Sequence, residues 1–289
     1  MQGADSMIIF RLSGGFGNQL FSFAAGYQVA KDRHETYAID TSTQEAPWFF
    51  RNLDIAHYDI HYDKKICYTL GDRKIDHLLL NHIHRRAALG LFTPTVKERN
   101  LYHYDPDIFN GNHGTVYYIG DWQCPQYFAH YEEDIRRMFI YHDQLSEEAA
   151  VLKQEIINTP NSVAVHARRG DYVQIGISLD QQFYRSCVMK IAEQVKDPVF
   201  YLFSEDPAWI MKAMQGLPYS FRLMDYASSQ KGLEDFELMR NCHHQIVSNS
   251  TYSWWAAWLN ENPGKIILRP NSGARKDTDF WPENWQIME

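Results

Sequence analysis

Several features that mark common protein classes are missing from this chain. The cysteines are Cys67, Cys124, Cys187 and Cys242, and no two of them form a CxxC pair. The sequence therefore gives no support to a zinc ribbon or a redox pair, and isolated cysteines fit a reducing compartment. No apolar run approaches the roughly 20 residues that span a bilayer, and no basic-then-apolar signal segment opens the chain. We expect a cytoplasmic protein, associated at most peripherally with the inner face of a membrane.

An excess of positive charge is also missing. Lys and Arg number 28 against 36 Asp and Glu, which gives a formal charge of −8. Nonspecific nucleic-acid binding depends on neutralising phosphates, so we expect no nucleic-acid partner. An anionic ligand would have to be held by local arginines. Hydrophobic residues make up 45% of the 289 positions, enough for one large or two medium domains with a sizeable core.

The amino-terminal region contains neither a Walker motif nor GxGxxG, yet it has a glycine-rich turn. A strand is predicted at residues 7–12, and a helix with apolar residues at helical spacing follows Gly14, Gly15 and Gly17. Such a strand–turn–helix brings backbone N–H groups to an anion or a polar substrate. The alternative is that the glycines only make a tight turn. A second strand is expected at 37–40.

The middle of the chain is harder to interpret. A helix is expected across residues 78–91, and a strand from 116 runs into Trp122 and Gln123. These side chains fit a sugar platform, and core packing is an equally common use of aromatic residues. A further helix at 145–156 is broken by residues 158–161. We place the domain boundary there, giving domains at 1–157 and 158–289.

After residue 161, strands and helices alternate regularly. Strands are predicted at 162–166, 199–203, 221–224, 245–247 and 265–268, and helices at 183–195, from Pro207, at 233–242 and after residue 251. This alternation is typical of a doubly wound parallel α/β sheet.

Three polar clusters each directly follow one of these strands, at 166–171, 204–206 and 248–251. Ligands of open parallel sheets bind outside the carboxyl ends of the strands, so the clusters would share one edge. The planar forks of Arg168 and Arg169 suit a diphosphate, and Asp171 can orient an arginine or take a proton. Taken one by one, the clusters could instead be a salt bridge, a surface turn and a helix cap.

Metal dependence has little support in the sequence. Asp-x-Asp occurs at 105–107 and at 277–279, but a chain this rich in aspartate contains such pairs by chance. Paired arginines can take the electrostatic role of a metal. We expect a metal-independent site without a cofactor.

Five stretches in the same order resemble the bacterial α-1,2-fucosyltransferases, of the glycosyltransferase family 11 type. They are residues 13–21, the Gly120–Gln123 stretch with 127–128, the HxRRxD-like run 166–172, residues 203–206, and 248–259. Together they extend over nearly the whole chain. The sequence departs from the family at Glu205, where Asp is more usual, and at Asp121, where an aromatic residue is common.

The resemblance implies a GT-B fold, with two Rossmann-like domains facing across a cleft. It implies an inverting bacterial enzyme that moves L-fucose from GDP-fucose to the 2-hydroxyl of a terminal galactose on a β-galactoside glycan. The carboxyl half would hold the nucleotide. The implied donor-binding residues are Gly15, Gly17, His166, Ser204, Asp206, Ser248, Asn249, Ser250 and Thr251, and the implied acceptor-binding residues are Trp122 and Gln123.

The resemblance implies catalytic roles for Arg168 and Arg169, and the chemistry of the reaction adds Asp171 and Asn18 as candidates. The two arginines would stabilise charge on the departing GDP. Either Asp171 takes the acceptor proton, or Asn18 orients the hydroxyl while the leaving phosphate takes it. The alternatives to this function are another linkage, another nucleotide sugar, or a sugar- or nucleotide-binding protein without activity.

Overall fold

The computed structural model describes residues 6–44, 52–60, 62, 64–66 and 93–289. The helix expected across 78–91 lies outside the described residues. The chain divides into two compact units, which we describe separately. Unit 1 comprises Met1–His142 with Thr278–Trp281, and unit 2 comprises Asp143–Asp277 with Pro282–Glu289. The division falls between residues 142 and 143, earlier in the chain than the boundary that we predicted at 157.

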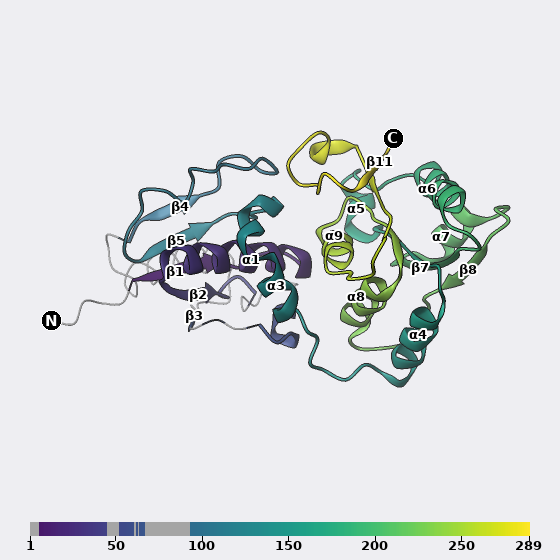
Figure 1. Cartoon of the computed structure of the whole chain (residues 1–289), viewed down its shortest axis with the longest axis horizontal. Helices are drawn as coiled ribbons and strands as arrows, with labels where there is room; N and C mark the ends of the chain where they lie inside the picture. Colours follow the sequence, from purple (N-terminus) through teal and green to yellow (C-terminus); the bar gives the residue numbers. More distant parts are fainter. Residues whose placement is uncertain (1–5, 45–51, 61, 63, 67–92) are drawn as a thin grey trace. The chain divides into compact units, whose positions relative to one another are not determined.

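Unit 1 is built on a five-stranded parallel sheet in the order β3-β2-β1-β5-β4. Its strands are β1 (Met7–Arg11), β2 (Thr36–Asp40), β3 (Lys64–Ile66), β4 (Thr95–Lys97) and β5 (Val116–Ile119). Its helices are α1 (Phe16–Arg33), the 3-10 helices η1 (Asp54–His57) and η2 (Pro125–Tyr131), and α3 (Glu132–Met138). The strand–turn–helix predicted near residue 15 is confirmed (Figure 1).

Helix α1 packs against β1 and β2 and is buried on most sides. It contains no proline, and it ends where His34 adopts a left-handed conformation with φ of 55° and donates its N–H to the Lys31 carbonyl at 3.2 Å. Because α1 is buried, its position in unit 1 is fixed. The glycine turn that precedes α1 is therefore fixed as well.

Unit 2 is built on a six-stranded parallel sheet in the order β11-β10-β9-β6-β7-β8. Its strands are β6 (Ser162–Ala167), β7 (Val199–Ser204), β8 (Ser220–Leu223), β9 (His244–Ile246), β10 (Ile267–Pro270) and β11 (Gln286–Met288). Its helices are α4 (Glu147–Asn158), α5 (Gly170–Gln174), α6 (Gln181–Gln194), α7 (Pro207–Met214), α8 (Lys231–Asn241), α9 (Thr251–Trp258) and the 3-10 helix η3 (Gly273–Arg275). The predicted alternation of strands and helices is confirmed, and α5 and β11 are additions to it.

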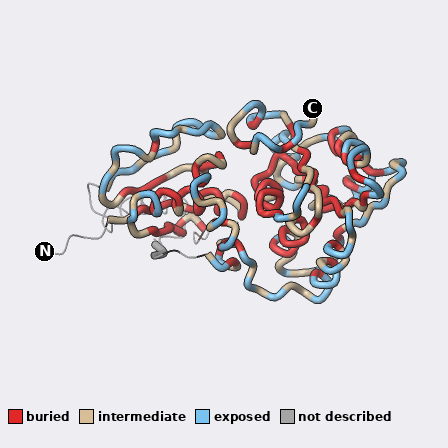
Figure 2. The backbone as a smooth tube through the Cα atoms, viewed as in Figure 1, coloured by how far each residue is buried: buried red, intermediate tan, exposed pale blue. Residues whose placement is uncertain are grey.

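Burial explains why these segments form strands and helices. All six residues of β6 are buried, as a strand covered on both faces requires, and Figure 2 shows the same for most of α9. The α9 helix buries Trp254, Trp255 and Trp258.

Helix α4 explains the difference in the domain boundary. Its apolar face buries Ala149, Leu152 and Ile156, and it packs against α8. Ser146 caps α4 and also donates to Glu234 of α8, from its backbone N–H at 2.7 Å and from its hydroxyl at 3.1 Å. The helix therefore belongs to unit 2, although our prediction placed it in the amino-terminal domain.

Candidate active site

Among the described strands, each sheet has one point at which the strand order reverses. The predicted site residues follow the strands beside these points, except Ser204 and Asp206, which lie at the end of β7. In unit 2 the chain runs outward from β6 through β7 to β8, and the later strands β9, β10 and β11 add on the other side of β6. In unit 1 the corresponding position lies between β1 and β5. Such switch points are where open α/β sheets bind ligands, because the loops that leave the two neighbouring strands diverge.

Arg168 follows β6 directly and is held by two carboxylates. Its Nη2 donates to Asp171 Oδ1 at 2.8 Å, and its Nη1 donates to Glu205 Oε1. The other oxygen of Glu205 accepts the backbone N–H of Arg169 at 3.0 Å. Gly170, with φ of 27°, begins the short helix α5 that carries Asp171 back toward Arg168. The structure thus brings Arg168 and Asp171 together as the sequence predicts.

Arg169 points into a different environment. Its guanidinium stacks over the Trp209 ring, with Cζ 4.1 Å from the ring centroid, and its Nη1 donates to Ser178 Oγ at 3.2 Å. Its Nε lies 3.9 Å from Asp206 Oδ2. Because both arginines are fixed by polar or aromatic neighbours, they lose little further freedom when an anion binds.

His166 lies at the end of β6 and is buried. Its Nδ1 is 3.0 Å from Ser248 Oγ, which is in turn 3.2 Å from Ser253 Oγ. Burial lowers the pKa of His166 to about 4, Arg168 lowers it further, and Glu205 opposes the shift. His166 is therefore neutral near pH 7. It joins the loops that leave β6 and β9 across the switch point.

Two of the remaining predicted donor residues, Asp206 and Ser250, also cap the following helices. Ser204 Oγ accepts the N–H of Asp206 at 3.1 Å, and Asp206 Oδ1 accepts the N–H of Trp209 at the start of α7 at 3.0 Å. Ser250 Oγ caps α9 by accepting the N–H of Tyr252 at 3.3 Å. The helix-cap alternative for the 248–251 cluster is thus confirmed at Ser250. Asp206, for which the alternative was a surface turn, is also a helix cap.

Asn249 and Thr251 flank that cap and are buried. Asn249 Nδ2 donates to the Ile177 carbonyl at 2.8 Å. Its Oδ1 is buried and has no hydrogen-bond partner within the described ranges of the chain. An unpaired buried acceptor costs free energy, because it has lost its hydrogen bonds to water.

In unit 1 the switch point is formed by amide side chains. Gly15 precedes the first residue of α1, Gly17 is buried in its first turn, and Asn18 Oδ1 accepts Gln123 Nε2 at 3.4 Å. The fully buried Gln19 bridges the Gly14 carbonyl at 3.2 Å and the Asn52 carbonyl at 2.7 Å. The structure thus brings Asn18 and Gln123 together within unit 1.

Trp122 has a different place from the one that we expected. Its side chain is fully buried, and its ring centroid lies 5.3 Å from those of Phe10 and Phe109 and 5.6 Å from that of Tyr127. A ring enclosed by three aromatic side chains presents no face to a sugar. The platform prediction for Trp122 is therefore corrected to core packing, which was the alternative.

Three contributors had no role among the predicted catalytic and binding residues. Glu205, Trp209 and Ser178 hold the two arginines, as described above. Glu205 had a signal, because it belongs to the predicted 204–206 cluster and directly follows β7. Ser178 and Trp209 are separated from Arg169 in sequence, and their contacts depend on the path of the chain between α5 and α6 and on the start of α7.

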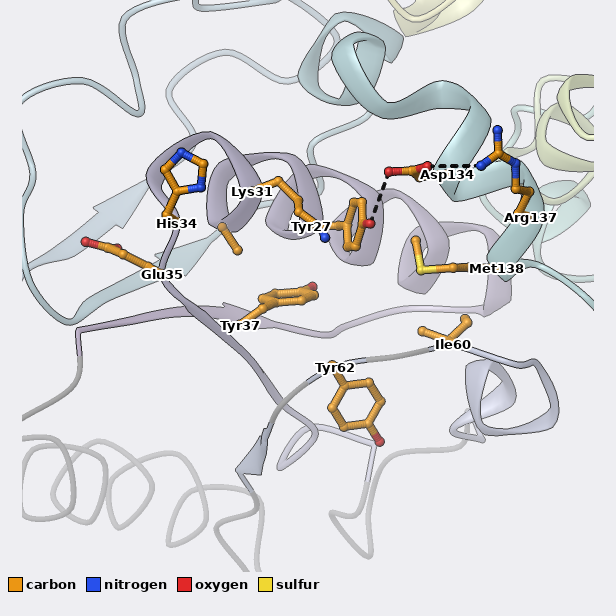
Figure 3. Close-up of a pocket in the computed structure, with 11 residues that line it drawn as sticks. Tyr27, Lys31, His34, Glu35, Tyr37, Ile60, Tyr62, Asp134, Arg137 and Met138 are labelled. Carbon is orange, nitrogen blue, oxygen red and sulfur yellow. Dashed lines mark hydrogen bonds and ion pairs between the residues drawn. The ribbon is translucent and has the colours of Figure 1, made fainter.

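A pocket of about 810 Å³ lies elsewhere in unit 1, beside the second half of α1 and helix α3. Figure 3 shows Tyr27 facing Asp134 there, with its hydroxyl 3.4 Å from Asp134 Oδ2. The lining residues are Tyr27, Ala30, Lys31, His34, Glu35, Tyr37, Ile60, Tyr62, Asp134, Arg137 and Met138. These do not include any predicted site residue, and the glycine turn lies at the other end of α1.

Comparison with known proteins identifies the family. A model described as Glycosyl transferase family 11 matches residues 99–289, about two thirds of the chain. The chain belongs to this family. It is 27% identical over 305 residues to an α-1,2-colitosyltransferase of Escherichia coli, covering 98% of this chain and 99% of the relative. A human galactoside α-(1,2)-fucosyltransferase 1 is 30% identical over 145 residues, covering 46% of this chain and 40% of that protein.

Solved structures support the fold. The α-1,6-fucosyltransferase NodZ soaked with GDP-fucose aligns with a TM-score of 0.57 at 17% identity, covering 92% of this chain and 95% of that one. A selenomethionine form of NodZ from Bradyrhizobium gives a TM-score of 0.59 at 18% identity, with the same coverage of both chains. The α/β fold of this glycosyltransferase is of the GT-B type, as the resemblance implied. No described helix is long and apolar enough to cross a membrane.

Proposed function

We propose that this enzyme moves L-fucose from GDP-fucose to the 2-hydroxyl of a terminal galactose, with inversion at the anomeric carbon. The observation that carries the proposal is the pair of fixed arginines at the switch point of unit 2, in a chain of glycosyl transferase family 11. The names of its relatives supply the sugar and the linkage, since several are α-1,2-fucosyltransferases of galactosides.

The mechanism follows from where charge develops. As the bond between the anomeric carbon and the phosphate oxygen breaks, the sugar becomes oxocarbenium-like and the departing GDP gains negative charge. Arg168 and Arg169 would donate hydrogen bonds to that pyrophosphate. A preorganised donor of this kind is typically worth on the order of 3 kcal/mol in the transition state. With two arginines in place we propose that no metal ion is needed, and activity in excess EDTA tests this.

The acceptor oxygen forms the new bond from the opposite face of the sugar ring and loses its proton. Asp171 is one candidate to take this proton. The leaving phosphate is the other, with Asn18 orienting the hydroxyl. Since Asp171 Oδ1 already accepts from Arg168, the Asp171→Asn variant would disturb the arginine as well. The Asn18→Ala variant separates the two routes, because it removes the orienting amide and leaves the arginine cluster intact.

We assign the nucleotide to unit 2 and the acceptor to unit 1. Ser204 and Asp206 would contact the nucleoside, and the 248–251 loop would contact the phosphate or fucose. In unit 1, Asn18 and Gln123 offer neutral donors and acceptors to an uncharged sugar hydroxyl.

The decisive experiment incubates purified protein with GDP-fucose and lactose, measures released GDP, and determines the linkage of the product by NMR. We expect GDP release that depends on acceptor and an α-1,2 linkage. A folded protein that releases no GDP with lactose or other β-galactosides would contradict the proposal. A product with a 1,3 or 1,6 linkage would support GDP-fucose as the donor but contradict the 2-hydroxyl as the acceptor position.

A second donor is worth testing because of one relative. The Escherichia coli protein that is 27% identical along almost the whole chain is an α-1,2-colitosyltransferase. Colitose is fucose without its 3-hydroxyl, so GDP-colitose and GDP-fucose would occupy the same phosphate site. A site that hydrogen-bonds the 3-hydroxyl would discriminate strongly against the deoxy sugar. The ratio of kcat/KM for the two donors with the same acceptor decides between them.

A further inference from the structure

Glu205 occupies a position fixed by the register of two neighbouring strands. The last residues of β6 and β7, Ala167 and Ser204, are partners in the parallel ladder. The next residue on each strand, Arg168 and Glu205, therefore leaves the sheet at the same level. Side chains at this point meet directly, as their hydrogen bond shows.

The carboxylate of Glu205 binds two donors at once. Oε1 accepts from Arg168 Nη1, and Oε2 accepts the Arg169 backbone N–H at 3.0 Å. A guanidinium has five N–H groups, and the bonds to Glu205 and Asp171 use one on each Nη nitrogen. The two carboxylates thus hold both Nη nitrogens of Arg168, and the second N–H on each of them can still face a phosphate.

We propose that Glu205 is a positioning residue for the transfer reaction, which fixes Arg168 in the orientation that meets the pyrophosphate of the donor. This rests on the proposed function. Glu205 acts through Arg168 and does not itself contact the sugar or the phosphates. The backbone N–H of Arg169 fixes the carboxylate of Glu205 at the strand end. The side chain of Arg168, which binds this carboxylate, is thereby fixed relative to the sheet.

The length of the side chain matters to this role. Glu205 spans from one strand end to a guanidinium and to the backbone N–H of the adjacent strand. An aspartate is one methylene shorter and would keep the charge but reach only one of the two donors. A glutamine keeps the length of the side chain. Its NH₂ group would face either Arg168 Nη1 or the Arg169 N–H, both of which are donors, so one hydrogen bond is lost together with the negative charge.

These substitutions predict graded losses. A hydrogen bond to a charged group contributes enough to change a rate or an affinity by about 10- to 100-fold. We expect Glu205→Gln to lower kcat by about 30-fold and Glu205→Asp by about tenfold, each relative to the wild-type protein. The acceptor KM should stay unchanged, because unit 1 is not altered.

A double-mutant cycle with Arg168→Ala tests the proposal. GDP affinity is measured by calorimetry, and kcat by released GDP, for the wild type, both single variants and the double variant. Glu205→Gln should weaken GDP binding in the wild-type background and have almost no effect when Arg168 is already alanine. Equal losses in both backgrounds would overturn the proposal, as would tighter GDP binding by Glu205→Gln, which would make the carboxylate a competitor of the phosphate.

Two controls keep the outcome clear. Glu193→Gln removes a carboxylate from an exposed pair with Lys190 and should change neither kcat nor GDP affinity. If Glu205→Gln does not fold, Glu205→Asp decides by the same cycle. Wild-type turnover is measured first. An inactive wild type would reject the proposed function, whereas an active wild type with an additive cycle would reject the role of Glu205 alone.

Discussion

The two units follow one plan and differ in the chemistry at their switch points. In unit 2 the loops after β6 and β7 carry charged groups that bind one another, as Arg168 does with Asp171 and Glu205. In unit 1 the loops after β1 and β5 carry amides, as in the pair of Asn18 and Gln123. The same topology therefore presents an ionic edge, with arginine–carboxylate pairs, in unit 2. In unit 1 it presents an amide edge, with the Asn18–Gln123 pair beside Asp121.

This difference matches the two kinds of substrate in the proposed reaction. A pyrophosphate is charged and is bound best by guanidinium groups with fixed orientation. A galactose hydroxyl is neutral, and an amide supplies both a donor and an acceptor without the cost of desolvating a charge. In the proposed reaction, unit 2 would bind the donor and unit 1 the acceptor. Each prediction below changes one edge and leaves the other intact.

The largest expected effect comes from removing the ionic edge. Arg168→Ala should lower kcat by about 100- to 1000-fold, since a preorganised donor to the developing charge is lost. GDP binding should weaken and the acceptor KM should stay similar. Steady-state kinetics with both substrates varied, together with calorimetry, measures the three quantities.

A matched cation outside the site serves as the control. Lys190→Ala removes an exposed lysine that is 2.9 Å from Glu193, and it should change neither kcat nor stability appreciably. Near-normal turnover by a folded Arg168→Ala variant would show that this arginine has no part in the mechanism. It would also contradict the proposal that the charged groups of unit 2 bind the pyrophosphate.

The second prediction uses pH, because the ionic edge includes a titratable His166 whereas amides do not titrate. The folded-state pKa of about 4 lies below the ordinary value of 6.5, so the unfolded chain takes up the proton first as pH falls. The stability due to neutral His166 is complete above pH 6.5 and is lost progressively toward pH 4. At about 1.4 kcal/mol per pH unit, the loss reaches about 3 kcal/mol.

Urea unfolding at pH 7 and pH 4.5 measures this loss. The variant His166→Gln keeps a polar side chain beside Ser248 but does not titrate, so its free energy of unfolding should fall less between the two pH values. If the free energy of unfolding falls equally for the variant and the wild type, His166 does not cause the loss of stability in acid. Glu205 and Arg168, which face His166, are unchanged in the comparison.

Much of the arrangement could be predicted because it is local in sequence. Apolar runs and helical spacing identify β6, β7 and the helices after them. Placing polar clusters at strand ends predicts that His166 and Ser248 meet. The contact of Glu205 with Arg168 could not be read in this way, because it depends on the register in which two strands pair. One residue of slip would separate the two side chains.

Other features depend on packing between distant segments. In sequence, Trp122 is a tryptophan after a strand, which suits a sugar platform. It is a core residue because Phe10, Phe109 and Tyr127 surround its ring, and these contacts are not local in sequence. The break after α4 resembles a linker, but that helix packs on α8. The return of residues 278–281 to unit 1 has no local signal at all: Tyr104 donates its N–H to Asp279 at 2.9 Å across most of the chain.

The smallest expected effect comes from the amide edge. Gly14 has φ of 76°, and an added Cβ would collide with Asn18 Nδ2. Gly14→Ala should therefore displace Asn18 and raise the acceptor KM by several-fold, with GDP affinity unchanged, besides costing about 1–2 kcal/mol for the left-handed backbone. Gly111→Ala is the matched control, because Gly111 has φ of 73° in the same unit with open space around it. Both variants should lose similar stability, and a change in acceptor KM in both would assign the effect to backbone strain and leave the orienting role of Asn18 without support.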